Sequence, residues 1–336
     1  MNPLAPITLA FGVSCALTWA MWRGARHWGA LDHPNQRSAH QRPTPTLGGV
    51  GVVGGVWAAL LAGLAAGQVE PEGAWPLLAG SLALLAAIRD DLGSPLGVAQ
   101  KAALILLACG GWLWCGPHLE WLSLPGGGHL TLGWWGWPLT ALWLLCWCNL
   151  YNFMDGIDGI AGVQTIGAGA WLAVWTWGSA PSLAWTSLAL IGAGAGFLVF
   201  NFPPARIFMG DVGALSLGFW LAGLGVLGEG EGLPLWIAVL PLGYYLYDTL
   251  YTLVRRALRG ENLLHGHNQH LYQRLTRAGW SHLQVDLGVL GLVLLLGGGG
   301  HAFREGQTGW GLLLLAAAVL ILVLATLWIE DQVPLD

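Results

Sequence analysis

The chain has 336 residues, of which 55% are hydrophobic and only 9% charged, with a mean hydropathy of +0.60. This composition excludes ordinary soluble domains and predicts a polytopic membrane protein. The formal net charge of -5, without a basic tail, argues against nucleic-acid binding.

Apolar tracts of nearly membrane-spanning length follow one another along the chain. Each approaches the ~20 residues that a helix needs to cross a bilayer. The tracts are 3–22, 48–67, 74–88, 101–116, 134–148, 160–177, 182–202, 212–228, 233–254, 283–299 and 308–329. We therefore expect an all-α integral membrane protein, a single polytopic domain over residues 1–336 with about eleven transmembrane helices.

The distribution of cations predicts the orientation. No positive segment precedes the first tract, and Arg23 and Arg26 follow it, which favours an uncleaved anchor with its N-terminus outside over a signal peptide. All Lys and Arg residues except Arg304 then fall on the inner side. The inner loops are 23–47, 89–101, 149–159, 203–211 and 255–282, and we expect them to form the active site.

Two glycine-rich stretches and an outer segment carry local structural signals. The segment 118–133 alternates apolar and polar residues around Pro-Gly-Gly-Gly, which predicts a short external β-hairpin. Close helix packing is favoured by the spacing of two sets of glycines: Gly48, Gly49, Gly51, Gly54 and Gly55, which begin in "TLGGVG" (46–51), and those of "GAGAG" (192–196). A phosphate-cradling loop at 46–51 is the alternative, although no Walker lysine follows it. The cysteines form no CxxC pair, so a packing role is favoured over a metal pair at Cys146 and Cys148.

Four polar clusters lie in the expected inner loops. They are Asp90 and Asp91; Asn149, Asn152, Asp155 and Asp158; Asn201, Arg206 and Asp211; and His265, His267 and His270. One such cluster would usually be a solvated loop, but four beside apolar tracts on one side indicate a functional site. Oxygen ligands from several segments suit Mg²⁺, and no thiolate cluster favours zinc.

Cations and histidines extend this pattern. Arg206 and the "RSAHQRP" loop (37–43), with Arg37 and Arg42, suit a diphosphate. His267 and His270 are spaced to share one helical face, where they could contact phosphate or move a proton; a zinc site and plain surface histidines are the alternatives. The residues together predict metal-dependent phosphoryl transfer at the boundary between membrane and cytoplasm.

Five segments, in their order and spacing, resemble the polyprenyl-phosphate N-acetylhexosamine-1-phosphate transferases of glycosyltransferase family four. They are "DHPNQRSAHQRPTPTLGGVG", "RDDLG", "NLYNFMDGIDGIAG", "NFPPARIFMGDVGAL" and "HGHNQHLYQRLTRAGW". The resemblance implies transfer of a sugar 1-phosphate from a UDP-N-acetyl sugar to undecaprenyl phosphate, with release of UMP. It also implies Mg²⁺, with Mn²⁺ as an alternative, and a bacterial inner (plasma) membrane protein with its active site on the cytoplasmic face.

The resemblance assigns roles to individual residues. Asp90 and Asp91 become the paired aspartates that engage the metal or deprotonate the lipid phosphate, and Asn152 and Asp211 become metal-site residues. Asp155 and Asp158 become candidates for catalysis and nucleotide contact. Expected substrate-binding residues are Arg37, Arg42, Thr44, Asn149, Asn201, Arg206, His267 and His270.

The sequence departs from the family at two places. No third carboxylate follows Asp91, and Thr46 and Leu47 follow Pro45 where the family often has an arginine. For the chemical step we favour direct attack by the lipid phosphate, with a covalent phospho-aspartyl intermediate at Asp155 as the rival.

The last inner loop helps to predict the branch of the family to which the chain belongs. "HGHNQH" differs from the three consecutive histidines of phospho-N-acetylmuramoyl-pentapeptide transferases. We therefore expect an enzyme that initiates O-antigen-type lipopolysaccharide or related chains, with the pentapeptide transferase as the alternative. A transporter is a further alternative, but the middle thirds of the tracts carry almost no ionisable residues. A non-catalytic scaffold would not explain the carboxylates, and a homodimer stays open.

Overall fold

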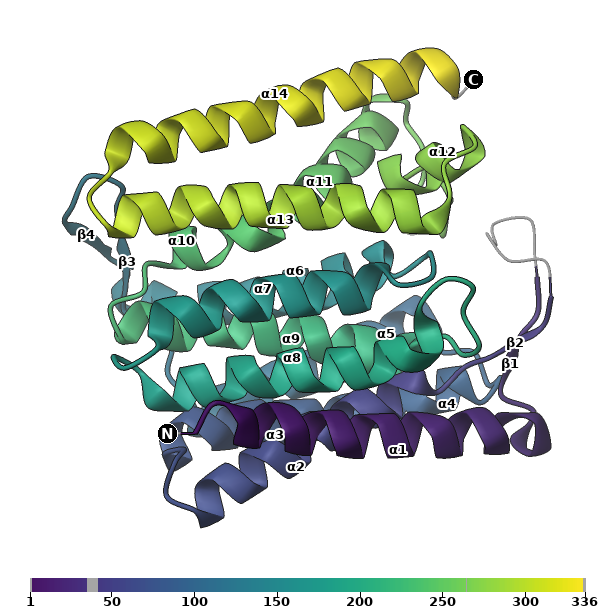
Figure 1. Ribbon diagram of the computed structural model, residues 1–336, viewed down its shortest axis with the longest axis horizontal. Coiled ribbons are helices and arrows are strands. Elements are labelled where there is room, and N and C mark those ends of the chain that lie inside the picture. The colour runs from purple at the N-terminus through teal and green to yellow at the C-terminus, as the bar shows by residue number, and fades with distance from the viewer. Residues whose placement is uncertain (1, 35–41, 264, 335–336) are drawn as a thin grey trace.

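Each of the apolar tracts is helical in the computed structural model, which describes residues 2–34, 42–263 and 265–334. The helices lie side by side in one bundle (Figure 1). The long helices are α1 (Leu4–Trp28), α2 (Gly48–Ala65), α3 (Pro71–Leu84), α5 (Val98–Cys115), α6 (Gly136–Met154), α7 (Ile160–Thr176), α8 (Pro181–Asn201), α9 (Gly210–Gly230), α11 (Gly243–Leu258), α13 (His282–Arg304) and α14 (Thr308–Gln332).

Shorter elements join these helices. The short α-helices are α4 (Ile88–Asp91), α10 (Leu235–Ala238) and α12 (Leu271–Arg277), and single 3-10 turns cover Leu85–Ala87, Gly133–Trp135 and Leu240–Leu242. The four strands are β1 (Leu31–Asp32), β2 (Thr44–Pro45), β3 (Trp121–Ser123) and β4 (His129–Thr131). They form two antiparallel pairs, β1 with β2 and β3 with β4.

The structure confirms an all-α integral membrane protein. Within the described residues, nine helical segments are long and apolar enough to cross a membrane. The apolar helix α7 has only 17 residues, and α6, with 19 residues, ends in the polar Asn149 and Asn152. The expected count of about eleven spans is therefore not confirmed, and the orientation stays a prediction.

Helix α9 forms the centre of the bundle. Of its most apolar window, 89% is buried inside the protein, compared with 22% for α1, α5 and α14. Small residues permit this central position: a Cβ atom on Gly49 of α2 would collide with the backbone of Gly213 in α9. A Cβ on Gly192 of α8 would likewise collide with the backbone of Ile7 in α1. The prediction of close helix packing at both glycine-rich stretches is confirmed.

The alternative, in which the loop at 46–51 binds phosphate through its glycine N–H groups, is wrong for Gly48 and Gly49. The N–H groups of Gly48 and Gly49 donate to the carbonyl oxygens of Phe208 and Met209, at 2.9 and 2.7 Å. These donors are already used to join the start of α2 to the segment before α9. They cannot also bind phosphate while that junction holds.

The predicted hairpin at 118–133 is present. Strands β3 and β4 pair with Leu122 opposite Leu130, and Glu229 at the end of α9 accepts a hydrogen bond from the Ser123 N–H at 2.6 Å. The hairpin lies at the end of the bundle opposite the β1–β2 ribbon and α12 (Figure 1). Its position outside the membrane stays a prediction.

Candidate functional site

A polar cavity of about 690 Å³ lies at the end of the bundle that carries the β1–β2 ribbon. All five predicted inner loops, or the helix ends beside them, contribute to its wall. Its polar side chains are Asp32, Thr46, Asp90, Asp91, Asn152, Asp155, Asp158, Asn201, Asp211 and Gln273. Seven of the residues predicted from the sequence therefore meet in one place: Asp90, Asp91, Asn152, Asp155, Asp158, Asn201 and Asp211.

Asp91 fixes the start of α9. Its carboxylate accepts hydrogen bonds from the backbone N–H groups of Asp211, at 2.9 Å, and Val212, at 3.3 Å. A carboxylate in this position satisfies free amides at a helix N-terminus and interacts favourably with the helix dipole. Gly210 makes the approach possible, because its φ is +76° and a Cβ there would collide with the Asp91 carboxylate.

Asp211 connects two further helices to this junction. Its Oδ1 accepts a hydrogen bond from Asn152 Nδ2 in α6 at 2.9 Å, and its Oδ2 lies 2.6 Å from Lys101 Nζ in α5. Lys101 also lies 3.2 Å from Asp90 Oδ2. One cation therefore bridges two of the predicted catalytic and metal-site carboxylates.

Sequence reasoning placed Lys101 only among the inner cations and missed its role in the site. The signal that could have revealed it is that Lys101 is the only lysine in the sequence. It also stands one turn inside an apolar helix, where an unpaired ammonium group is costly. Asp32, Thr46 and Gln273 also line the cavity without having been predicted.

Asp155 lies where α6 ends, surrounded by other acids. Burial, and after it the charges of Asp211, Asp91 and Asp158, together raise the pKa of its carboxyl group to about 7. The wall of the cavity thus holds more negative charge than Lys101, which pairs with Asp90 and Asp211 from outside the lining, can balance. A bound cation would relieve this repulsion.

Asp158 and Asn201 hold the walls of the cavity together. Asp158 Oδ2 accepts a hydrogen bond from the Ala205 N–H at 2.9 Å and lies 3.3 Å from His282 Nδ1. Asn201 is 4% exposed; its Oδ1 accepts from the Gly159 N–H and its Nδ2 donates to the Ile207 carbonyl. Both residues therefore join the loop after α6 to the segment before α9.

Most of the predicted substrate-binding residues lie outside the cavity lining of the described chain, and Arg37 falls outside the described residues. Arg42 is exposed, and Thr44 in β2 donates a hydrogen bond to its carbonyl oxygen. Asn149 donates to a carbonyl of its own helix, and Arg206 lies over the Trp22 ring at 6.0 Å. Their substrate contacts stay predictions.

The prediction that His267 and His270 share one helical face is wrong, because His267 lies in the loop before α12 and His270 is the residue that precedes the helix. Neither histidine is in the cavity lining of the described chain. His270 is 2% exposed, and its Nδ1 lies 2.9 Å from Oδ1 of Asp248, which is fully buried in α11. The His267 ring is 4.9 Å from the His270 ring. Burial, then the charges of His270 and Arg256, lower the pKa of His267 to about 4, so its imidazole is neutral at physiological pH.

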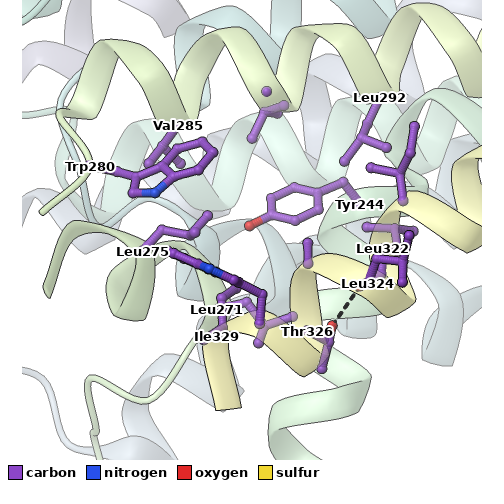
Figure 2. A pocket seen from close by; sticks show the side chains of 15 residues that line it. Tyr244, Leu271, Leu275, Trp280, Val285, Leu292, Leu322, Leu324, Thr326 and Ile329 are labelled. Atoms are coloured by element: carbon purple, nitrogen blue, oxygen red, sulfur yellow. Dashed lines mark hydrogen bonds between the residues drawn. The ribbon is translucent and has the colours of Figure 1, made fainter. Parts of the chain in front are cut away.

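A second cavity of about 440 Å³ lies on the other side of α12 (Figure 2). Its walls are almost wholly apolar and come from α11, α12, α13 and α14. Leu271 and Leu275 of α12 face this space, whereas Gln273 of the same helix faces the polar cavity. Helix α12 therefore separates a polar cavity from an apolar one.

Comparison with known proteins finds one matching family model and several relatives whose names describe transferases. The family model described as glycosyl transferase family 4 matches residues 74–229. The chain is 30% identical to a probable undecaprenyl-phosphate N-acetylglucosaminyl 1-phosphate transferase of Bacillus subtilis (strain 168), over 76% of this chain and 72% of that protein. It is 34% identical to a phospho-N-acetylmuramoyl-pentapeptide-transferase of Synechococcus sp. (strain JA-3-3Ab), over 83% of this chain and 85% of that protein.

One relative is named as an N-acetylglucosaminyl 1-phosphate transferase and the other as a pentapeptide transferase, so the predicted O-antigen branch is not confirmed. The family itself is confirmed, and the matched region contains the paired aspartates, the loop after α6 and the start of α9. The chain belongs to glycosyl transferase family 4.

Proposed function

We propose that this protein transfers a sugar 1-phosphate from a UDP-sugar to undecaprenyl phosphate and releases UMP. The sugar would be an N-acetylhexosamine or a related N-acetylated deoxyhexosamine. The reaction would take place at the cytoplasmic face of a bacterial plasma membrane. The observation that carries the proposal is the polar cavity whose wall contains Asp90 and Asp211, two carboxylates that both pair with Lys101. It lies at one end of a bundle whose helices are long enough to span a membrane.

The residues of the cavity fit Mg²⁺. Among the described residues, no group of three or more His, Cys, Asp or Glu side chains forms a closed metal cage. Mg²⁺ does not need one, because it usually keeps several waters and takes one or two carboxylates together with substrate phosphates. Asp211 and Asn152, joined at 2.9 Å, would hold it beside the surplus charge around Asp155. When bound, the ion would offset negative charge on the diphosphate.

The chain's own residues favour direct attack. An oxygen of the lipid phosphate attacks the β-phosphorus of the UDP-sugar, and the bond from that phosphorus to the bridging oxygen breaks as UMP leaves. The lipid phosphate is already mostly ionised at neutral pH, so positioning matters more than a strong base. Lys101 would supply a positive charge beside the two cavity carboxylates Asp90 and Asp211, from which its Nζ lies 3.2 and 2.6 Å away.

The alternative of a covalent intermediate at Asp155 finds less support. A nucleophilic carboxylate must be ionised, and the pKa of Asp155 is raised to about 7 by burial and by its acidic neighbours. Direct attack by the lipid phosphate does not need an ionised Asp155.

Replacing Asp211 by Asn tests the proposed function. Purified protein would be incubated with undecaprenyl phosphate, Mg²⁺ and a panel of UDP-N-acetyl sugars, and UMP release would be measured. We expect release by the wild type and by Glu305→Gln, an exposed acid after α13 at the other end of the bundle, and a large loss in Asp211→Asn. No UMP from well-folded wild type with any sugar would favour a transporter or scaffold, and full turnover by Asp211→Asn would refute the site.

A further inference from the structure

Helix α12 connects the histidine segment to the polar cavity. His270 immediately precedes the helix, and Gln273 lies in the cavity wall. The hydroxyl of Tyr272 donates a hydrogen bond to the carbonyl oxygen of Phe153 at 3.0 Å, two residues before Asp155. The placement of α12 therefore sets the position of one wall of the cavity and of the loop that carries Asp155.

Apolar packing fixes this helix only in part: Leu271 and Tyr272 are 2% and 0% exposed, and Tyr272 belongs to the main hydrophobic core. With seven residues, α12 is too short to be stable by its own backbone hydrogen bonds. Its apolar side chains Leu271 and Leu275 face the cavity of about 440 Å³ (Figure 2), where a close-packed protein interior would place other side chains. On the side of this cavity, polar contacts therefore supplement the apolar packing of α12.

The strongest polar contacts come from the last helix. The Arg274 side chain of α12 is fully buried and forms an ion pair with Glu330 of α14. Its second terminal nitrogen donates to the carbonyl oxygens of Ile329, at 3.2 Å, and Val333, at 2.7 Å. A buried guanidinium group without its carboxylate would be strongly destabilising, so this pairing confines α12 to one position.

Glu330 also joins α14 to α11. Its Oε1 accepts a hydrogen bond from the Tyr251 hydroxyl at 2.8 Å, and its Oε2 lies 3.0 Å from Arg255 Nη2. Helix α11 in turn holds the other end of α12, because Asp248 accepts hydrogen bonds from the N–H groups of Leu271 and Tyr272. One carboxylate at the end of α14 thus connects both elements that carry the histidine segment.

We propose that Glu330 is a positioning residue for the transfer reaction: it aligns α12, and with it the cavity wall at Gln273 and the Asp155 loop, through Arg274. The expected effect of Glu330 on the reaction rate rests on the proposed function, whereas its effect on the position of α12 does not. Glu330 lies outside the cavity lining and touches no reacting group in the described chain, so it acts through the position of α12.

The test compares Glu330→Gln with Asp331→Asn. Asp331 is the next residue and is exposed, so its substitution removes the same charge without touching Arg274. We expect Glu330→Gln to lower kcat by about tenfold, the equivalent of one charge-assisted hydrogen bond, while KM for the UDP-sugar changes by less than about twofold. Asp331→Asn should leave both constants unchanged.

Hydrogen exchange gives a readout that needs no substrate. The backbone amides of residues 271–277 should exchange at least about tenfold faster in Glu330→Gln than in the wild type or Asp331→Asn, while the amides of α9 keep their protection. Uniformly faster exchange in all helices would mean general destabilisation and would overturn the positioning role. Wild-type exchange at 271–277 together with wild-type kcat would also overturn it.

A milder variant covers the case in which Glu330→Gln does not fold. Tyr251→Phe removes one hydrogen bond to Glu330 and keeps every charge. We expect a smaller rise in α12 exchange and a loss in kcat of about threefold; no change in either would overturn the proposal. If the wild type releases no UMP, the proposed function fails, whereas the exchange comparison still decides whether Glu330 holds α12.

Discussion

Lys101 is the residue whose removal should affect the site most. Its ammonium group lies 2.6 Å from Asp211 Oδ2 and 3.2 Å from Asp90 Oδ2. Lys101→Met keeps the length of the side chain but leaves both carboxylates without their cation, facing a substrate that is itself a diphosphate. We therefore expect a large loss of kcat/KM with a smaller effect on folding.

The size of this loss can be worked from the exposure of the Lys101 side chain. Removing one group that stabilises developing charge in an active site typically costs about 2.7–4 kcal/mol of transition-state stabilisation, and the 32% exposure of the Lys101 side chain favours the lower value. A cost of about 2.7 kcal/mol is roughly a hundredfold in kcat/KM. Lys101→Arg keeps the charge and should recover part of the activity, limited by its wider planar group.

The assay is UMP release from a UDP-sugar and undecaprenyl phosphate by purified protein. Arg304→Met is the matched control, because it removes one cation at the opposite end of the bundle. We expect that control to lie within about twofold of the wild type, as surface charge changes usually have small effects. A Lys101→Met variant that keeps its unfolding temperature and loses less than about threefold in kcat/KM would refute the electrostatic reasoning.

Three further outcomes follow from the geometry. Gly210→Ala should lower the free energy of unfolding by more than about 1 kcal/mol, because the methyl group meets the Asp91 carboxylate at a φ of +76°; an unchanged thermal unfolding midpoint would contradict this. Because the pKa of Asp155 is raised to about 7, this residue's contribution to the stability of the metal-free protein is fully present below about pH 4 and is lost as the pH rises through about 7. Asp155→Asn should therefore flatten the curve of unfolding free energy against pH over that range. Parallel curves for the variant and the wild type would contradict this. Because the pKa of His267 is lowered to about 4, His267→Gln should leave the shape of the rate profile between pH 6 and 8 unchanged, and a lost inflection near pH 6.5 would show that this histidine titrates there.

Much of the fold could be predicted because lipid imposes a simple rule on sequence. Each apolar tract became a helix, since a backbone in a membrane must satisfy its own hydrogen bonds. The count of spans was less secure because α6 ends in polar residues that belong to the site, which lowers its hydropathy. Asn152 thus lines the cavity but lowers the hydropathy by which α6 would be identified as a transmembrane helix.

The candidate site could be predicted in outline but not in the roles of individual residues. Asp90 and Asp91 are neighbours in sequence, yet Asp90 pairs with Lys101 while Asp91 caps α9. The burial of His270 depends on its contact with Asp248, which lies 22 residues earlier in an apolar tract. No local sequence pattern predicts that these two residues pair. Lys101 was overlooked because a single cation near a helix end is usually an interfacial anchor.

The enclosure of α9 bears on how this sequence can change over evolutionary time. A helix surrounded by protein on nearly all sides cannot exchange one residue without disturbing several neighbours, whereas only 22% of the most apolar window of α1, α5 and α14 is buried inside the protein. Variation among descendants should therefore gather on those three outer helices. The α9 sequence should drift only in step with its neighbours, since a small displacement of its axis would move the Asp211 carboxylate as well.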